Sequence, residues 1–170
     1  MLDDKGYRYN VGIIIINQNK KVFWAKRTCE EAWQFPQGGI KKGESPDNAM
    51  LRELYEETGL KPNHIQLIGK TNNWLYYDVP NYLIKNNWKG KYKGQRQIWF
   101  LLNFVGNEED IILNRKENPE FDAWRWLDYH EAPSLVINFK KKIYCNALTE
   151  LSNYIFFGEE LEEIKLKLSR

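Results

Sequence analysis

The sequence predicts a single α/β domain in which a mixed β-sheet lies between helices. Strand-like segments rich in β-branched and aromatic residues share the chain with two helical segments, and no repeat or low-complexity stretch interrupts them. The chain has 170 residues, 42% of them hydrophobic and 15% aromatic, so it can bury one sizeable core. The same composition excludes a disordered chain.

Net charge, cysteine content and hydropathy limit the kinds of partner and compartment. The formal net charge of +2 is too small for nonspecific attraction to nucleic acid, so an anionic ligand would have to meet a local cluster of cations. Cys29 and Cys145 are the only cysteines and form no disulfide framework, which favours a reduced, cytoplasmic setting. The first residues, MLDDKGYRYN, show no basic region followed by a long apolar run, and no later stretch approaches about 18 apolar residues, so we expect neither secretion nor membrane association.

The first half of the chain begins with a predicted β-hairpin. Residues 9–16 are mostly apolar and β-branched and stop at three amide residues, 17–19, after which residues 22–26 would return beside them. Residues 33–39 read WQFPQGG, a strand end that runs into a proline and glycine loop. We expect this loop to deliver the chain to a helix.

The predicted helix has start and stop signals of its own. Ser45 can cap its first turn, Pro46 suits the first helical position, and Gly59 is the residue expected just past the end. The helix should therefore run for about three turns between Ser45 and Gly59.

The second half supplies further strands and a second helix. Short strands are expected at residues 65–71, 74–77, 97–104 and 123–127. Residues 80–94 should form a loop, and we interpret its four lysines as a solvated surface rather than an RNA contact.

Apolar residues at spacings of four and three predict an amphipathic helix from about residue 139 to 154, ended by Gly158. We therefore divide the chain into a domain, residues 1–157, and a charged C-terminal tail, residues 158–170. We expect the tail to be either a frayed helix or disordered.

Three glutamates of the first helix lie on one narrow stripe. Glu53, Glu56 and Glu57 stand at i, i+3 and i+4, where like charges repel by roughly a few tenths of a kcal/mol per pair. A bound cation would remove this penalty, and carboxylates on a rigid segment suit Mg²⁺ or Mn²⁺. On these residues alone, the favoured interpretation is a solvated acidic face with Arg52 paired to Glu56.

A longer pattern changes that interpretation. Residues 38–60 read GGIKKGESPDNAMLRELYEETGL, with specified residue types at nine positions. Such a pattern arises by chance in fewer than about one in a million chains of this size. It resembles the Nudix box in full. The resemblance implies a loop, helix and loop that hold divalent metal ions against a diphosphate and direct water onto it.

Segments outside the box resemble one branch of the Nudix hydrolases, the bacterial RNA pyrophosphohydrolases. These segments cover most of residues 1–150 and read MLDDKGYR, VGIIIIN, WQFPQGGI, NWLYYDVP, GQRQIWFLL, PEFDAWRW and NFKK. The resemblance implies an enzyme that removes pyrophosphate, or successive phosphates, from the 5′ triphosphate or diphosphate end of RNA. The product is a 5′ monophosphate end, which promotes mRNA decay. The expected partner is the unpaired 5′ end of single-stranded RNA.

The same resemblance implies the metal ligands and the reacting groups. Mg²⁺ or Mn²⁺ would be held by four carboxylates and a backbone carbonyl, from Gly38, Glu53, Glu56, Glu57 and Glu120. Either Glu53 or Glu57 would accept the proton of the attacking water, and the sequence does not choose between them. Arg52 would orient a glutamate rather than touch the substrate. His64 and His130 lack the spacing of zinc ligands, so no zinc is expected.

Substrate-binding residues implied by the resemblance come from four separate segments; they are Arg8, Arg27, Gln95, Ile137, Phe139 and Lys140. The two arginines and the lysine would hold the 5′ phosphates. Phe139 would stack on a base, a contact that contributes about 1–3 kcal/mol, and Ile137 would lie near the next base. Gln95 would touch the phosphates or hold a loop. From position alone, the arginines are ordinary solvated charges and Phe139 is equally a core residue.

Two alternatives to an RNA 5′ pyrophosphohydrolase stay open. Dinucleoside polyphosphate hydrolases share the fold and the metals, and only a kinetic comparison of the two substrates would separate them. A Nudix-fold nucleotide or RNA sensor without catalysis is the other alternative, and the unbroken acidic set of the box argues against it. We expect a monomer, and a protein activator is compatible with the sequence.

Overall fold

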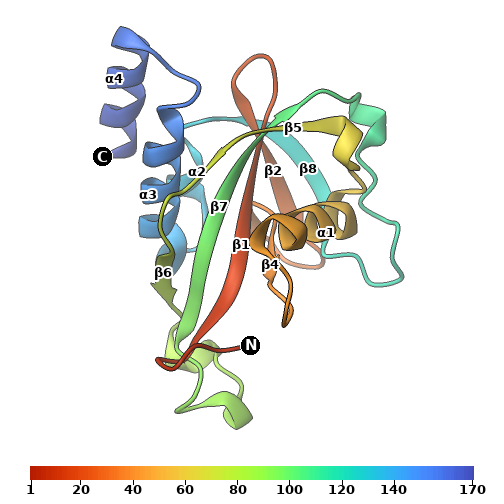
Figure 1. The fold of residues 1–170 in the computed structure, drawn as a ribbon, viewed down its shortest axis with the longest axis vertical. Coiled ribbons are helices and arrows are strands. Elements are labelled where there is room, and N and C mark those ends of the chain that lie inside the picture. Colours follow the sequence, from red (N-terminus) through yellow and green to blue (C-terminus); the bar gives the residue numbers. More distant parts are fainter.

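The structure, a computed structural model, describes residues 1–170. An eight-stranded mixed sheet forms its centre, with helices on both faces (Figure 1). Strands β1 (Tyr7–Ile16) and β7 (Gly94–Phe104) run parallel in the middle of the sheet over ten paired residues. All other strand pairs are antiparallel. The predicted fold class, a single α/β domain with a mixed sheet between helices, is confirmed.

The remaining strands flank this parallel pair. β2 pairs with β1, β3 and β8, while β4 pairs with β1, and β7 pairs with β5 and β6. Their bounds are β2 (Lys21–Arg27), β3 (Trp33–Gln34), β4 (Gln37–Gly39), β5 (Ile65–Lys70), β6 (Leu75–Asp78) and β8 (Phe121–Asp128). The predicted hairpin and the later strands are therefore all present.

Four α-helices surround the sheet: α1 (Pro46–Thr58), α2 (Ala132–Leu135), α3 (Lys141–Ser152) and α4 (Gly158–Leu168). The first helix has the predicted caps, since Ser45 Oγ accepts a hydrogen bond from the Asn48 N–H at 3.1 Å and Gly59 follows with a φ of 77°. α1 covers one face of the sheet, and α3 and α4 lie on the other (Figure 1). No helix combines the length and the apolar character that crossing a membrane requires.

Two hydrophobic cores lie on the two faces because successive strand residues point to opposite sides. Ile13 and Ile15 of β1 pack into the core beneath α1 with Leu54. Ile14 of the same strand packs into the other core with Tyr144 of α3. The sheet is thereby fixed from both sides, and its edges and loops present the polar residues.

The C-terminal region differs from the prediction. α3 begins at Lys141 and ends at Ser152, so Phe139 and Lys140 lie in a preceding 3-10 turn, Asn138–Lys140. Gly158 does not end α3; it begins α4.

The tail is neither frayed nor disordered, because α4 packs against α3. Leu168 is only 3% exposed, and Leu161 and Ile164 pack partly into the same core. These residues recur at helical spacing within a charged segment, and the prediction of a frayed or disordered tail missed that stripe.

Candidate active site

α1 and β4 approach each other closely at the acidic half of the site. A Cβ atom on Gly38 would overlap the Glu53 carboxylate, so only glycine allows this approach. Glu53 and Glu56 are partly buried, and Glu57 is 7% exposed. Glu53 therefore faces the strand, while the Glu56 side chain remains 34% exposed beside Arg52 and Lys116.

Glu57 is a buried carboxylate with an unsatisfied oxygen. The Gln37 backbone N–H favours the ionised carboxylate and so lowers the pKa of Glu57, while the Glu57 Oε2 atom has no hydrogen-bond partner. Burial raises the pKa of Glu57 well above its usual value, and the charges of Glu53 and Glu120 raise it further. A buried oxygen without a partner destabilises the fold, and a cation would satisfy it.

Arg52 gathers the other acids of the segment. Its guanidinium donates to Glu44 Oε1 and Oε2 at 2.8 and 2.9 Å, and to the Gly39 carbonyl at 2.8 Å. Its Nη1 atom lies 2.7 Å from Glu53 Oε1 and 3.5 Å from Glu56 Oε2. The hydrogen bonds from Arg52 lower the pKa of Glu44 to about 2, whereas burial raises the pKa of Glu53. The predicted contact between Arg52 and Glu56 is present, but Arg52 is bonded more closely to Glu44 and Glu53.

The carboxylates are not gathered around a common point. No group of three or more histidine, cysteine, aspartate or glutamate side chains lies close enough to hold a metal ion. Glu53 and Glu56 turn toward Arg52, and Glu120 lies exposed just before β8, 3.6 Å from Arg27 Nη1. The donor set nevertheless fits a hard divalent cation, because it consists of carboxylates and includes the unsatisfied Glu57 oxygen.

Lys140 is the buried cation of the site. Its side chain is 7% exposed, and its Nζ atom donates to Gln34 Oε1 at 3.2 Å and to Gln37 Oε1 at 3.3 Å. Burial lowers the pKa of Lys140 to about 8, and the positive charge of Arg27 lowers it as well. No carboxylate forms an ion pair with it, so this charge has only neutral amide acceptors.

Aromatic rings lie beside this lysine. The Phe139 and Tyr77 ring centroids are 5.9 Å apart, and Lys140 Nζ lies 5.8 Å from the Tyr77 ring. Gln37 Nε2 donates to the Tyr77 hydroxyl at 3.3 Å. Ile137, two residues before Phe139, is 49% exposed. The interpretations of Phe139 as a stacking residue and as a core residue are compatible, because the ring is partly buried against the core and remains partly exposed.

Arg8 and Gln95 are neighbours across the β1–β7 ladder. Gln95 is buried, and its Nε2 atom donates to the Tyr92 hydroxyl at 2.9 Å, so it holds the loop before β7. Arg8 is exposed, and its guanidinium lies directly against Gly39. Arg8 therefore lies beside the glycines that precede the acidic helix.

Arg27 lies between acidic side chains. Its Nε atom is 2.6 Å from Glu30 Oε2 and its Nη1 atom is 3.6 Å from Glu120 Oε1. Burial raises the pKa of Tyr77, and the charges of Arg8 and Arg27 oppose this increase. The charges of both arginines thus act on the Tyr77 hydroxyl, and Lys140 Nζ lies 5.8 Å from the Tyr77 ring.

A comparison with known protein families decides the identity of this arrangement. A model described as the NUDIX domain matches residues 6–147. The chain belongs to the NUDIX family. Membership supports a hydrolase that acts on pyrophosphate bonds, and NUDIX hydrolases generally need Mg²⁺ or Mn²⁺.

Solved NUDIX structures share this fold. The E. coli dihydroneopterin triphosphate pyrophosphohydrolase matches with a TM-score of 0.64 and 18% identity, over 85% of this chain and 98% of that one. A C. elegans Ap4A hydrolase binary complex matches with a TM-score of 0.62 and 17% identity, over 87% and 97% of the two chains. A Nudix hydrolase from M. smegmatis matches with a TM-score of 0.56 and 13% identity, over 90% and 89%. At these identities the similarity establishes the fold alone.

Three contact residues of this NUDIX site were not singled out from the sequence; they are Gln34, Gln37 and Tyr77. Gln34 is buried at the end of a short strand, and Gln37 lies partly buried in the next one. Two glutamines within an apolar strand and glycine loop are a signal that could have found them, because a buried amide needs polar partners.

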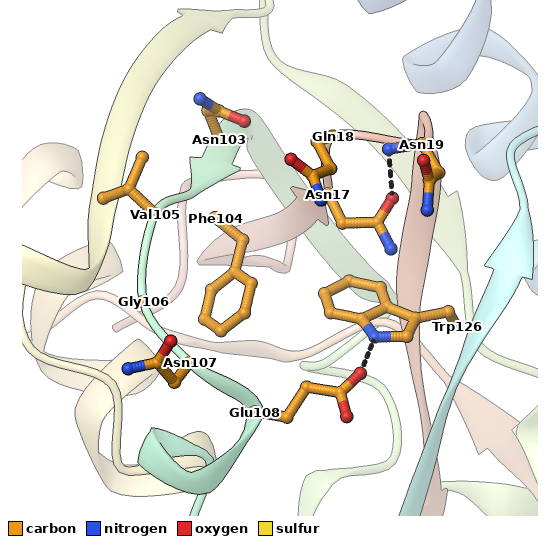
Figure 2. Close-up of a pocket in the computed structure, with 10 residues that line it drawn as sticks. All are labelled: Asn17, Gln18, Asn19, Asn103, Phe104, Val105, Gly106, Asn107, Glu108 and Trp126. Atoms are coloured by element: carbon orange, nitrogen blue, oxygen red, sulfur yellow. Dashed lines mark hydrogen bonds between the residues drawn. The ribbon is translucent and has the colours of Figure 1, made fainter.

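A cavity of about 590 Å³ lies away from this site, at the other end of β1 and β7 from Arg8 and Gln95 (Figure 2). Phe104 and Trp126 form part of its wall, and Trp126 Nε1 donates to Glu108 Oε1 at 2.8 Å. Asn17 accepts hydrogen bonds from the backbone of its own turn. None of the predicted site residues lines this cavity, and its polar groups are largely engaged in local bonds.

Proposed function

We propose that this NUDIX protein hydrolyses the 5′ triphosphate or diphosphate end of RNA in a metal-dependent reaction. It would release pyrophosphate, or phosphates in succession, leave a 5′ monophosphate and thereby promote mRNA decay. The observation that carries the proposal is the position of Gln37. Its backbone N–H favours the ionised form of Glu57 and lowers its pKa, and its side chain is hydrogen-bonded to Lys140 and Tyr77. One residue thus joins an acidic group suited to a cation with a cationic, aromatic group suited to a nucleotide.

In this proposal the acidic half holds Mg²⁺ or Mn²⁺ through Glu53, Glu56, Glu57, Glu120 and the Gly38 carbonyl. The bound cation supplies neutralisation of phosphate charge and a more acidic water. Glu57 or Glu53 then accepts the proton of the attacking water, and a raised pKa brings such a base closer to neutral pH. Arg52 fixes the Glu53 carboxylate through their 2.7 Å contact.

The cationic half binds the phosphates. Lys140 is buried and has only amide acceptors, so an anionic phosphate oxygen would supply the negative charge that no protein side chain places next to it. Arg8 and Arg27 add guanidinium donors from two neighbouring strands. Arg27 would exchange its contacts with Glu30 and Glu120 for the phosphate and the cation respectively.

The turn before α3 supplies the nucleotide contacts. Phe139 would stack on the first base with Tyr77 beside it, and the exposed Ile137 would lie near the next base. These residues adjoin Lys140, so stacking and phosphate binding take place within one short segment. This arrangement supports an unpaired RNA end, because bases in a duplex do not offer their faces.

The proposed hydrolase unit comprises residues 1–157, with residues 158–170 appended as a packed helix. We propose a cytoplasmic monomer, in keeping with the two free cysteines. Light scattering at working concentration would check the monomer, and a dimeric mass would contradict it.

The purified protein should be incubated with Mg²⁺ and with RNA labelled in its γ-phosphate. We expect labelled pyrophosphate or phosphate, RNA with a 5′ monophosphate, and no turnover after chelation of the metal. The double variant Glu53→Gln, Glu57→Gln should be inactive, while Glu163→Gln on the exposed face of α4 serves as the matched control. Turnover of nucleotides but never of RNA ends would contradict the proposal.

Dinucleoside polyphosphate hydrolysis is the second candidate. The chain shares its fold with a C. elegans Ap4A hydrolase, and a stacking ring beside a buried lysine suits any nucleoside 5′ polyphosphate. The ratio of kcat/KM on triphosphorylated RNA to kcat/KM on diadenosine tetraphosphate decides between the two. We expect this ratio to favour RNA.

A further inference from the structure

A basic and aromatic segment borders the proposed site. The 79–93 loop reads VPNYLIKNNWKGKYK and contains four lysines and no acidic residue. All four lysines are exposed, and none forms an ion pair. The loop extends from one end of the sheet, beside the N-terminus (Figure 1). Unpaired positive charge is therefore concentrated at this end of the molecule.

A cavity of about 490 Å³ opens between the 79–93 loop and the N-terminus. Met1 and Leu2 form one wall, Leu83 and Trp88 form another, and Arg8 reaches the same space. Its volume lies in the range typical of small-molecule sites. The cavity thus combines apolar walls with a cation that the proposed function assigns to the 5′ phosphates.

Trp88 is 43% exposed in this wall. Its ring packs edge-on against Tyr92, with centroids 6.4 Å apart, and its indole N–H forms no hydrogen bond within the protein. An exposed tryptophan among lysines is typical of surfaces that bind single-stranded nucleic acid, where bases stack on rings and lysines meet phosphates.

The cavity shares Arg8 with the proposed active site. The Tyr92 hydroxyl accepts a hydrogen bond from Gln95, and Gln95 is paired in register with Arg8. The base of the loop is fixed, because the Val79 N–H donates to the Lys93 carbonyl at 2.8 Å and the Lys93 N–H donates to the Gly6 carbonyl at 2.8 Å. The loop is therefore held in place next to Arg8.

We propose that the 79–93 loop and the N-terminal residues form a second RNA subsite, which binds nucleotides downstream of the 5′ end. One base would enter the cavity and stack on Trp88, and the loop lysines would contact the following phosphodiesters. This inference rests on the proposed RNA substrate. Charge favours RNA over a dinucleoside polyphosphate, because the latter ends at its second nucleoside and offers no further phosphates to four lysines.

Equilibrium binding tests this subsite apart from catalysis. The probe is a ten-nucleotide single-stranded RNA with a 5′ hydroxyl, followed by fluorescence anisotropy. Trp88→Ala should weaken its binding about five- to tenfold, while Trp88→Phe retains a stacking ring and most of the affinity. The double variant Lys85→Ala, Lys89→Ala should lower the slope of log affinity against log salt by about 1.4. Lys61→Ala, Lys167→Ala, a pair of exposed lysines elsewhere, should leave the slope unchanged.

Kinetics separate the outcomes. On triphosphorylated RNA, Trp88→Ala should raise KM more for a ten-nucleotide substrate than for a dinucleotide, and kcat should be retained. Unchanged binding of the ten-nucleotide RNA by Trp88→Ala would overturn the inference. So would an equal loss of activity on diadenosine tetraphosphate, because the cavity would then serve a second nucleoside. Failure of the proposed function gives a different result. The wild type would then hydrolyse neither the triphosphorylated ten-nucleotide RNA nor the triphosphorylated dinucleotide, and the binding comparison would still decide whether the subsite exists.

Discussion

The acidic and cationic halves of the site are built in different ways. The acidic half lies mostly within residues 52–57 of α1, where helical spacing alone places the side chains on one stripe. The cationic half is collected from β1, β2 and the turn before α3, so it exists only once these elements have packed. The first half is therefore a local property of the chain, and the second is a property of the fold.

Each half also contains one buried charge that lacks a partner of opposite sign. Glu57 has an unsatisfied oxygen and a raised pKa, whereas Lys140 has amide acceptors and a lowered pKa. The two form no ion pair with each other, and Lys140 Nζ donates instead to the Gln34 and Gln37 side chains. The two halves therefore differ in the sign of the counter-charge that each of them lacks.

Glu57→Gln breaks the acidic half and has the largest expected effect. Loss of a proton acceptor typically reduces turnover by about 10²–10⁴-fold, and the variant should still fold because it removes a buried charge. Turnover of γ-labelled RNA and thermal unfolding measure the two effects. A variant with normal turnover would remove Glu57 from the mechanism, and Glu163→Gln provides the surface control.

Lys140→Met breaks the cationic half. We expect weaker substrate binding, seen as a raised KM, together with a gain in the free energy of unfolding of about 1–3 kcal/mol at pH 7, because a buried cation is replaced by an apolar chain. Lys141→Met, at the exposed neighbouring position, should produce neither change.

The stability gain from Lys140→Met should depend on pH. Lys140 has a pKa of about 8 in the folded protein, against 10.5 for an ordinary lysine. Between these values the unfolded chain binds more protons than the folded one, so the free energy of unfolding of the wild type rises with pH. The advantage of the variant should therefore be full below pH 8 and shrink toward pH 10. Urea unfolding across this range measures it, and a constant advantage would contradict the burial of a charged lysine.

Arg52→Met sharpens the comparison from the acidic side. Arg52 donates hydrogen bonds to Glu44, Glu53 and the Gly39 carbonyl. Because the guanidinium is partly buried, we expect the variant to lose about 1–2 kcal/mol in the free energy of unfolding. The lowered pKa of Glu44 gives stability that is present above its usual pKa and is lost as pH falls to about 2. The gap between wild type and variant should close over that acidic range in chemical unfolding. Arg52→Lys, which keeps the charge without the planar fork, should fall between them.

Tyr77→Phe has the smallest expected effect. It removes the acceptor of the 3.3 Å hydrogen bond from Gln37, a loss of about 0.5–1.5 kcal/mol, and leaves Lys140 in place. A small increase in KM is expected without a change in kcat. Tyr76→Phe on the exposed side of the same strand is the control. Equal effects of the two variants on KM would show that Tyr77 has no specific role in the site.

The parts that the sequence predicted well are local ones. The caps at Ser45 and Gly59 and the acidic stripe of α1 follow from spacing within one helix, and the strands follow from short apolar runs. The end of α3 was predicted wrongly at Gly158. The side-chain amide of Asn153 donates to the Glu150 carbonyl at 2.9 Å and closes the helix there, so no glycine is needed.

The network around Gln37 could not be predicted from spacing. Its hydrogen-bond partners Tyr77 and Lys140 are 40 and 103 residues away along the chain, and only strand pairing and helix packing bring them together. Resemblance to a family pointed to Lys140 but gave no reason for its burial. The structure adds that reason, because two glutamine side chains accept from its ammonium group.

Because of the parallel ladder between β1 and β7, a change in chain length has different effects in β1 and in the 79–93 loop. Inserting or deleting one residue between Arg8 and Ile13 would turn the arginine to the opposite side of the sheet and spoil its match with Gln95. The 79–93 loop stands outside the ladder, so it can grow or shrink while the hydrolytic machinery keeps its register. Insertions there would alter the wall of the neighbouring cavity and leave the pairing of Arg8 with Gln95 unchanged.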